Sequence, residues 1–131
     1  MTIEPDGDDH LGYSVMDDPR FSWQRGDGPK RPIVEAFCMA LFAGAEAEKF
    51  FLGSVDIGDG VDCDRATNCL AWLGLPGASY VGDEVFDRNE ARLRAKARVA
   101  VIQHRAAIQR VAAALVEHRT LSGDQVDALI R

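Results

Sequence analysis

The chain has 131 residues, of which 47% are hydrophobic and 27% are charged, and its net charge at pH 7 is −6. The length suits one domain, and the composition is that of a globular chain rather than a disordered one. The charge is uneven, because residues 1–28 carry −5 and residues 54–87 carry −6, whereas residues 88–119 carry +6. An acidic body with one basic segment argues against non-specific nucleic-acid binding by the whole protein.

The sequence favours a cytoplasmic protein without membrane contact. The uncharged apolar run from Ala36 to Ala45 has ten residues, and a membrane span needs about 20. The N-terminal residues have neither a basic start nor an apolar stretch, so they do not form a signal peptide. Three cysteines without a Cys-x-x-Cys pattern, Cys38, Cys63 and Cys69, indicate a reducing compartment, where they pack as small apolar groups.

Residues 1–28 are predicted to form two short strands and a loop. Residues 2–4 are extended and are followed by Pro5 and an acidic turn, and residues 11–16 alternate in the manner of a second strand. We therefore expect a short N-terminal β-hairpin. The following loop contains Phe21 and Trp23, which we expect to attach it to the core.

Residues 32–52 are predicted to form the central helix. Pro32 suits the first turn of a helix, and Gly53 is a stop signal. One apolar stripe is widened by a second set, so that the helix is apolar on most sides, as expected for a buried helix. The stripe consists of Ile33, Phe37, Leu41, Gly44 and Phe51, and the second set of Val34, Cys38, Phe42 and Ala45.

The remaining elements are also helical. Residues 62–73 have helical spacing and are followed by Gly74, Pro76 and Gly77. Residues 86–118 are either one bent helix or two helices broken near His104. The run Ser-Gly-Asp-Gln at 122–125 is a capping-box pattern that opens a short final helix. The predicted fold class is mainly α, with the N-terminal strand pair making it α+β, in a single domain over residues 1–131.

Two carboxylates are candidate site residues. Glu48 lies on the buried stripe of the 32–52 helix, and spacing alone favours its reaching solvent at the helix end. Asp62 follows a glycine-rich loop and is predicted to be an N-cap that accepts from the backbone N–H of Asp64 or Arg65. The aspartates at 56–64 lack the spacing and the closing glutamate of a calcium-binding EF-hand loop. Of the three histidines, at positions 10, 104 and 118, no two form a helical metal-binding pair.

Four segments follow, in order, the motifs of one known family. Residues 41–48 read Leu-Phe-Ala-Gly-Ala-Glu-Ala-Glu, against Leu-Leu-Gly-Gly-x-Ala-Ala-Glu. Residues 57–67 read Ile-Gly-Asp-Gly-Val-Asp-Cys-Asp-Arg-Ala-Thr, against Thr-Gly-x-x-x-Asp-Leu-x-x-Ala-Thr. Residues 117–125 are similar to Glu-x-x-Thr-Leu-x-Gly-x-Glu, and residues 2–5 with 11–13 are similar to a strand pair. Together they resemble the peptidase domain of the FtsH family, which are membrane-anchored, ATP-dependent zinc metalloproteases.

The resemblance implies a helical bundle of the FtsH peptidase type with a short β-hairpin, and roles for both carboxylates. The family's third zinc ligand matches Asp62, and a glutamate near its metal matches Glu48. The match suggests that Glu48 lies next to the zinc ligands and does not bind the metal itself. The family's other two ligands and its general base come from an upstream His-Glu-x-x-His helix. This chain contains no His-Glu-x-x-His. We therefore expect no zinc in this chain, and a metal role for Asp62 that is only vestigial.

Three functional hypotheses remain. The first is a catalytically inactive FtsH-peptidase-like domain, a pseudoenzyme that acts as a binding or regulatory module for a protein partner. The second is a truncated zinc metallopeptidase whose zinc-binding helix lies upstream of Met1. The third is a helical adaptor or nucleic-acid binder that uses the basic helix 88–110, and we rank it last because such charge runs are mostly solvated faces.

The missing family helix also predicts an assembly. Without it, the side of the 32–52 helix that bears Phe37, Leu41 and Phe42 would be uncovered, and monomers rarely expose large apolar patches. A second copy is the nearest available cover, so we predict a homodimer. The rival expectation is that the loop with Phe21 and Trp23 folds over the gap as an internal lid.

Overall fold

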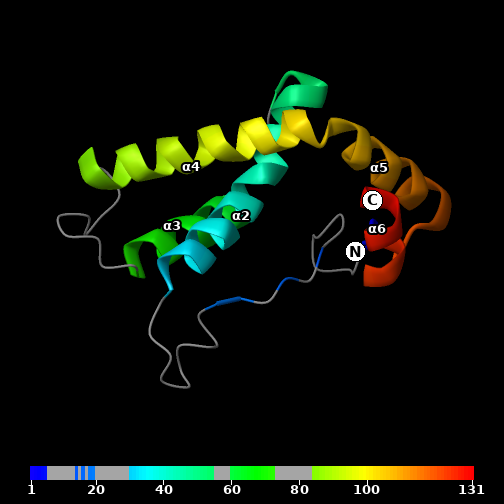
Figure 1. The fold of residues 1–131 in the computed structure, drawn as a ribbon, viewed down its shortest axis with the longest axis horizontal. Helices are drawn as coiled ribbons and strands as arrows, with labels where there is room; N and C mark the ends of the chain where they lie inside the picture. Colours follow the sequence, from blue (N-terminus) through cyan, green and yellow to red (C-terminus); the bar gives the residue numbers. More distant parts are fainter. Residues whose placement is uncertain (6–13, 15, 17, 20–29, 55–59, 73–83) are drawn as a thin grey trace. The chain divides into compact units, whose positions relative to one another are not determined.

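The computed structural model describes residues 1–5, 14, 16, 18–19, 30–54, 60–72 and 84–131. Within these ranges the chain is mainly helical, as predicted, with five helices (Figure 1). They group into two compact units, one spanning Asp18–Gln103 and the other combining Met1–Asp17 with His104–Arg131. The single domain and the FtsH-type bundle stay predictions. The helices are α2 Arg31–Leu52, α3 Gly60–Trp72, α4 Glu84–Gln103, α5 Arg105–His118 and α6 Gly123–Ile130.

Helix α2 begins and ends where the sequence predicts. A proline occupies the first turn, where a missing N–H costs nothing. Gly53 ends the helix in the left-handed conformation with φ 79°, a conformation that glycine adopts without steric cost. Lys49 lies in the last turn, where a positive charge is favourable beside the helix dipole.

One apolar core joins α2, α3 and α4. Phe42 and Leu70 are inaccessible to solvent or nearly so, and Phe86 and Leu93 add the side chains of α4. Figure 1 shows α4 crossing α2 while α3 lies beside α2. The full set of buried residues is Val34, Phe37, Cys38, Leu41, Phe42, Ala66, Cys69, Leu70, Phe86, Leu93 and Ala97.

The core corrects two sequence expectations about α2. The buried stripe runs through Val34, Cys38 and Phe42, whereas Ile33 is 53% exposed and Phe51 is 38% exposed. The buried face is therefore centred on Val34, Cys38 and Phe42, which the sequence predicts only to widen the apolar stripe. The premise of the homodimer prediction is also wrong, because Phe37, Leu41 and Phe42 are buried in the core with α3 and α4. The homodimer itself stays a prediction.

The long C-terminal element is two helices, which decides between the two alternatives left open by the sequence. The break is at His104, whose backbone leaves the helical region at φ −100° and ψ 13°. The buried positions of α4 end at Val101, and those of α5 begin at Val111. Because no buried position lies between these two residues, nothing in the core requires the helix to continue through the break.

The second unit has a small apolar cluster and several backbone bonds. Val111, Leu115 and Leu121 are its buried residues. The N-terminal residues pair with the segment before α6, through an antiparallel bridge between Thr2 and Thr120. Met1 and Leu121 exchange two hydrogen bonds of 2.9 and 3.1 Å between backbone atoms, and the Ile3 N–H donates to the Arg119 carbonyl at 2.9 Å.

Local hydrogen bonds define the turn after α5 and the start of α6. The predicted capping box of α6 is confirmed, since the Gln125 N–H donates to Ser122 Oγ at 3.3 Å and the Ser122 N–H donates to Gln125 Oε1 at 2.8 Å. Arg119 follows α5 at φ 65° and ψ −39°, and the Thr120 N–H donates to the His118 carbonyl at 2.7 Å. This is a γ-turn of the rarer, strained hand.

Some sequence expectations lie outside the described residues. The first strand of the predicted hairpin corresponds to the residues paired with Thr120, but most of residues 11–16 are outside the described ranges, so the hairpin stays a prediction. The loop with Phe21 and Trp23, the stop signals after Leu73 and the acidic loop at 56–59 are also outside them. No helix within the described ranges is long and apolar enough to cross a membrane.

Candidate functional site

A row of carboxylate–arginine pairs joins α2 to α4. Arg92 donates both terminal nitrogens to the Glu35 carboxylate, at 2.7 and 3.4 Å. Arg31 adds a third bond of 2.9 Å from its Nε. The hydrogen bond from Arg92 is the main cause that lowers the pKa of Glu35, and partial burial opposes it. Glu35 is therefore held ionised between two helices.

Glu46 is the buried carboxylate of α2, with 5% of its surface exposed. Arg98 Nε donates to its Oε2 at 2.7 Å, while the Arg98 side chain itself is 53% exposed. Sequence reasoning selected Glu48 and missed Glu46. The signal was present, because Val34, Cys38, Phe42 and Glu46 are spaced by four residues and so share one helix face.

Arg94 is the most constrained cation of α4. Its Nε donates to Glu90 at 2.8 Å, its Nη2 donates to Cys63 Sγ at 2.9 Å, and the guanidinium lies 4.3 Å from the centre of the Phe42 ring. Burial by itself would lower the pKa of Arg94, but the bonds to Glu90 and Cys63 raise it. The guanidinium thus links α3 and α4 over an aromatic side chain of α2.

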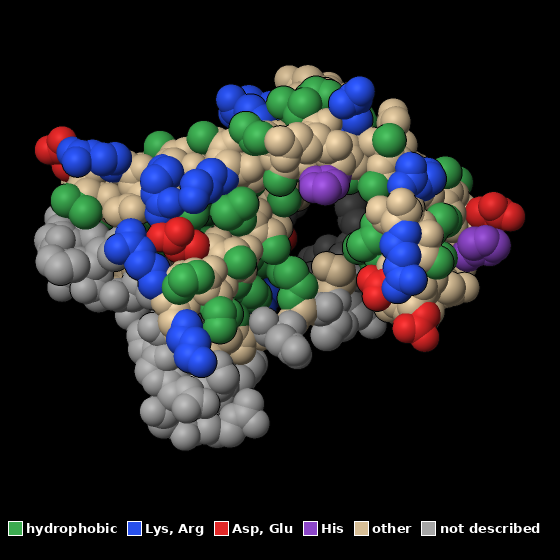
Figure 2. All heavy atoms as spheres, viewed as in Figure 1, with side chains coloured by type: hydrophobic (Ala, Val, Ile, Leu, Met, Phe, Trp, Pro, Cys, Tyr) green, Lys and Arg blue, Asp and Glu red, His purple; other side chains and the backbone are tan. Residues whose placement is uncertain are grey.

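Every arginine of α4 has a carboxylate partner. Beyond the three already described, Arg88 pairs with Glu84 at 2.7 Å, one turn earlier on α4. The space-filling view shows that lysine and arginine side chains gather along this helix (Figure 2). Four of the seven basic residues in the predicted basic helix 88–110 are therefore paired with carboxylates of α2 and α4.

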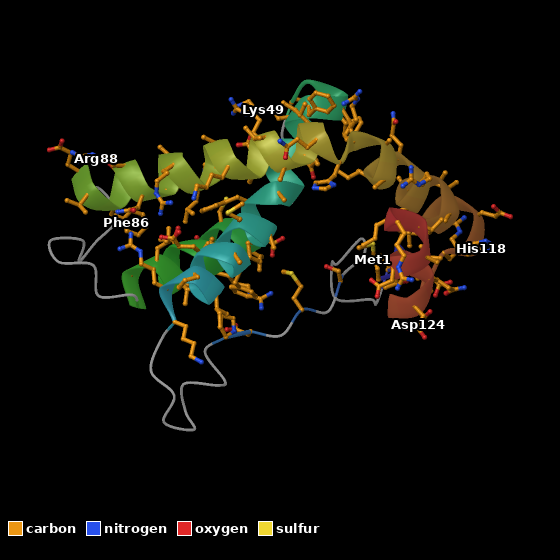
Figure 3. All side chains as sticks on the ribbon, viewed as in Figure 1. Met1, Lys49, Phe86, Arg88, His118 and Asp124 are labelled. Carbon is orange, nitrogen blue, oxygen red and sulfur yellow. The ribbon has the colours of Figure 1, made fainter. Side chains whose placement is uncertain are left out.

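A pocket of about 480 Å³ lies where α2 and α4 meet. Its charged residues are Glu46, Lys49, Arg94 and Arg98, and its other lining residues are three alanines, Ala45, Ala91 and Ala95. Figure 3 labels Lys49 on the part of α2 that approaches α4. A second, shallower pocket on α4 is lined by Met39, Arg92, Ala95, Lys96, Val99, Ala100 and Gln103.

Asp62 and Glu48 do not form a metal site with the residues described. Asp62 is the third residue of α3, because the helix begins at Gly60, so the N-cap prediction is wrong and its carboxylate lies inside the first turn. Glu48 is half-buried near the end of α2. No group of three histidine, cysteine, aspartate or glutamate side chains within the described ranges could hold a metal ion. Catalytic zinc needs three protein ligands, so this donor set does not fit it.

The thiols of Cys38 and Cys69 are packed in the core and are not activated nucleophiles. Cys38 and Cys69 are inaccessible to solvent, and Cys38 Sγ donates to the Ala66 carbonyl at 3.6 Å. The hydrogen bond with Cys69 and then burial raise the pKa of Cys38. A neutral thiol is a poor nucleophile, so this pair is part of the core between α2 and α3.

The C-terminal end of α2 exposes three consecutive large apolar side chains. Phe50 is 44% exposed, Phe51 is 38% exposed and Leu52 is 75% exposed. The two rings pack edge to face, with centres 4.9 Å apart. Because they contact each other, they present one apolar surface instead of isolated groups. We call these three residues the α2 apolar end.

No protein-family model, curated protein or solved structure matches this chain. The likeness to FtsH peptidase domains therefore rests on the motifs of the sequence.

Proposed function

We propose that this chain is an FtsH-peptidase-like domain that acts as a binding module and is catalytically inactive as a peptidase. The order and spacing of four sequence segments support the family likeness. The helices that carry Glu48 and Asp62 pack against each other, so both residues belong to one helix pair. No His-Glu-x-x-His is present among the 131 residues, so neither the ligand pair nor the general base of the family is available in this chain.

The observation that carries a binding function is the α2 apolar end. Three adjacent large apolar side chains are exposed on one helix terminus, and contiguous exposed apolar surface is a mark of interaction sites. The partner we propose is a second copy of the chain. A two-fold axis brings the same surface of two copies together, so an apolar surface is complementary to itself without any further feature.

The nucleic-acid alternative has less support. A nucleic-acid surface needs basic side chains that are free to replace the counterions of phosphates. The four arginines of α4 already have carboxylate partners within the unit. A phosphate backbone that runs along α4 would have to compete with the pairs of Arg88, Arg92 and Arg94, whereas Arg98 uses only its Nε for Glu46.

Light scattering of the purified chain tests the proposed assembly. We expect a mass of twice 14.3 kDa for the wild type and of 14.3 kDa for Leu52→Asp. The matched control is Val116→Asp, which places the same charge at a side chain of α5 that is 72% exposed, and it should stay dimeric. A wild-type monomer at micromolar concentration, or equal behaviour of the two variants, contradicts the proposal.

A metal and peptidase assay tests the inactive state. We expect no casein cleavage and no stoichiometric zinc after purification without added metal, because Asp62 is the only candidate ligand that the resemblance supplies. Casein cleavage that a chelator abolishes would overturn the proposal in favour of a zinc peptidase. Asp62→Asn distinguishes the cases further, since it should leave an inactive chain unchanged and should abolish a zinc-dependent activity.

A further inference from the structure

The pocket between α2 and α4 has the size of a small-molecule site. Its volume is about 480 Å³, within the range of roughly 300–1,000 Å³ that is usual for ligand pockets. Its apolar lining consists of alanines from both helices. Because an alanine side chain is a single methyl group, a ligand can come close to both helix backbones.

The lining is positively charged. Lys49, Arg94 and Arg98 face one carboxylate, Glu46, and Arg94 is also paired with Glu90 beside the lining, so the pocket residues and this partner carry a net charge of +1. An anionic ligand matches this charge. A phosphate monoester is such an anion, and its three oxygens can accept from more donors than the two oxygens of a carboxylate.

Donors are available at this pocket. Arg98 uses its Nε for Glu46, and within the described ranges its two terminal nitrogens make no hydrogen bond. Lys49 is exposed and makes no ion pair with any described residue. A guanidinium fork beside an ammonium group is suited to the oxygens of a phosphate.

The second pocket on α4 lacks this combination. Arg92 lines it, but both of its terminal nitrogens bond Glu35. Lys96 is then its one cation without an ion-pair partner among the described residues. The remaining lining is mainly apolar, including Met39 and Val99. The two pockets lie on the same helix pair and so form a natural comparison.

We propose that the pocket between α2 and α4 binds a small molecule that carries a phosphate monoester. Lys49 and the terminal nitrogens of Arg98 hold the phosphate oxygens. Glu46 fixes Arg98 through its Nε, and Arg94 lines the pocket in a position set by Glu90 and Cys63. The inference is independent of self-association through the α2 apolar end.

Titration of the full chain at constant ionic strength tests the site. Ribose 5-phosphate, inorganic phosphate and ribose are the three probes, and the methyl NMR signals of Ala45, Ala91 and Ala95 are the readout. We expect both phosphates to shift these signals with saturation, and ribose to leave them unchanged. Tighter binding of ribose 5-phosphate than of phosphate supports a phosphate monoester as the ligand, and equal binding contradicts it in favour of free phosphate. No saturable shift with either phosphate overturns the inference.

Matched lysine variants distinguish phosphate binding at this pocket from a general effect of the net charge of the protein. Lys49→Gln should weaken phosphate binding about tenfold, the size of one charge-assisted hydrogen bond. Lys96→Gln makes the same change in net charge at the second pocket and should leave the affinity unchanged. Arg98→Lys keeps a cation for Glu46, so the fold is retained, and it should also weaken binding. Equal losses in Lys49→Gln and Lys96→Gln would refute the site.

Discussion

The two compact units are stabilised by different interactions. The α2–α4 unit buries eleven residues in one cluster, so apolar burial is its main source of stability. The α5–α6 unit buries only three in its own cluster and relies on backbone bonds from residues 1–3, on a capping box and on a bond of 2.7 Å from Arg110 Nε to the Leu129 carbonyl. A hydrogen bond contributes about 1 kcal/mol net, so each support named for the smaller unit is weak compared with the burial of a large core side chain in the larger unit.

Truncating the core should show this difference most strongly. Phe42→Ala should cost about 3–5 kcal/mol, because Phe42 has no exposed surface and contributes to the packing of all three helices. Leu115→Ala in α5 should cost about 2 kcal/mol, the low end for leucine, because the neighbouring cluster is small and can collapse. Urea unfolding of each variant measures both values.

Amide hydrogen exchange shows which helices are destabilised by each substitution. Phe42→Ala should accelerate exchange in α2, α3 and α4 more than in α5 and α6, since the loss is in the first core. The exposed Val116→Ala is the control and should stay within about 0.5 kcal/mol of the wild type. If Leu115→Ala costs as much as Phe42→Ala, the proposed difference between the units is wrong.

Ion pairs should differ according to burial. Arg98→Met leaves the buried Glu46 carboxylate without its partner and should cost about 2 kcal/mol. Arg88→Met removes a pair in which both side chains are more than two-thirds exposed, so it should cost less than about 0.5 kcal/mol. Methionine keeps much of the apolar stem in both variants. Thermal and urea unfolding compare the two, and equal costs would mean that Glu46 reaches water in solution.

Loss of the cap should affect the smaller unit alone. Ser122→Ala removes the hydroxyl that accepts from the Gln125 N–H at the start of α6 and should cost about 1 kcal/mol. Exchange of the α6 amides should accelerate, while that of α2 should not change. Ser54→Ala, at an exposed serine just after α2, is the matched control and should be neutral.

The turn after α5 should respond in the opposite direction. Arg119 holds a strained backbone at φ 65°, which costs of order 1–3 kcal/mol in a side-chain-bearing residue. Glycine relieves the strain and loses about 0.5–1 kcal/mol of chain entropy, so Arg119→Gly should stabilise the chain by about 1 kcal/mol. His118→Gly, one residue earlier at the last position of α5, has no strain to relieve and should destabilise the chain by about 0.5 kcal/mol. A neutral or destabilising Arg119→Gly would show that the turn is relaxed.

The sequence predicts the helices well because their signals are local. Gly53 ends α2, the Ser122 capping box starts α6, and the weak point at His104 separates α4 from α5. These features depend on neighbours in sequence. Residue type and spacing predict the first two, and they leave the break at His104 as one of two alternatives. The predicted start of α3 is two residues late, because an aspartate after a glycine-rich loop has the pattern of an N-cap whether or not the helix has already begun.

The candidate site was harder to predict because it depends on pairing across helices. Glu46 and Arg98 are 52 residues apart, and no local pattern states which carboxylate meets which arginine. Spacing by four from Phe42 could have identified Glu46 as buried, and burial then requires a partner. The choice of partner follows only from the angle at which α4 crosses α2.

The smallest expected effect concerns the pH dependence of the pair between Glu35 and Arg92. The pKa of Glu35 lies below its ordinary value of 4.5 in the folded chain. The folded state therefore binds this proton less readily than the unfolded state. The contribution to stability is present above pH 4.5 and is lost as the pH falls through the lowered pKa.

Comparison of the wild type with Glu35→Gln tests this sign. The wild type should be more stable near neutral pH by less than about 1 kcal/mol, because the Arg92 side chain is partly exposed to water. The difference should shrink as the solution is acidified from about pH 6 to about pH 2.5. Arg92→Met removes the main cause of the lowered pKa, so in that background Glu35→Gln should change stability little at any pH. A difference that grows on acidification would show that burial, which raises the pKa of a carboxyl, outweighs the two arginines, and that this pair differs from the rest of the α2–α4 row.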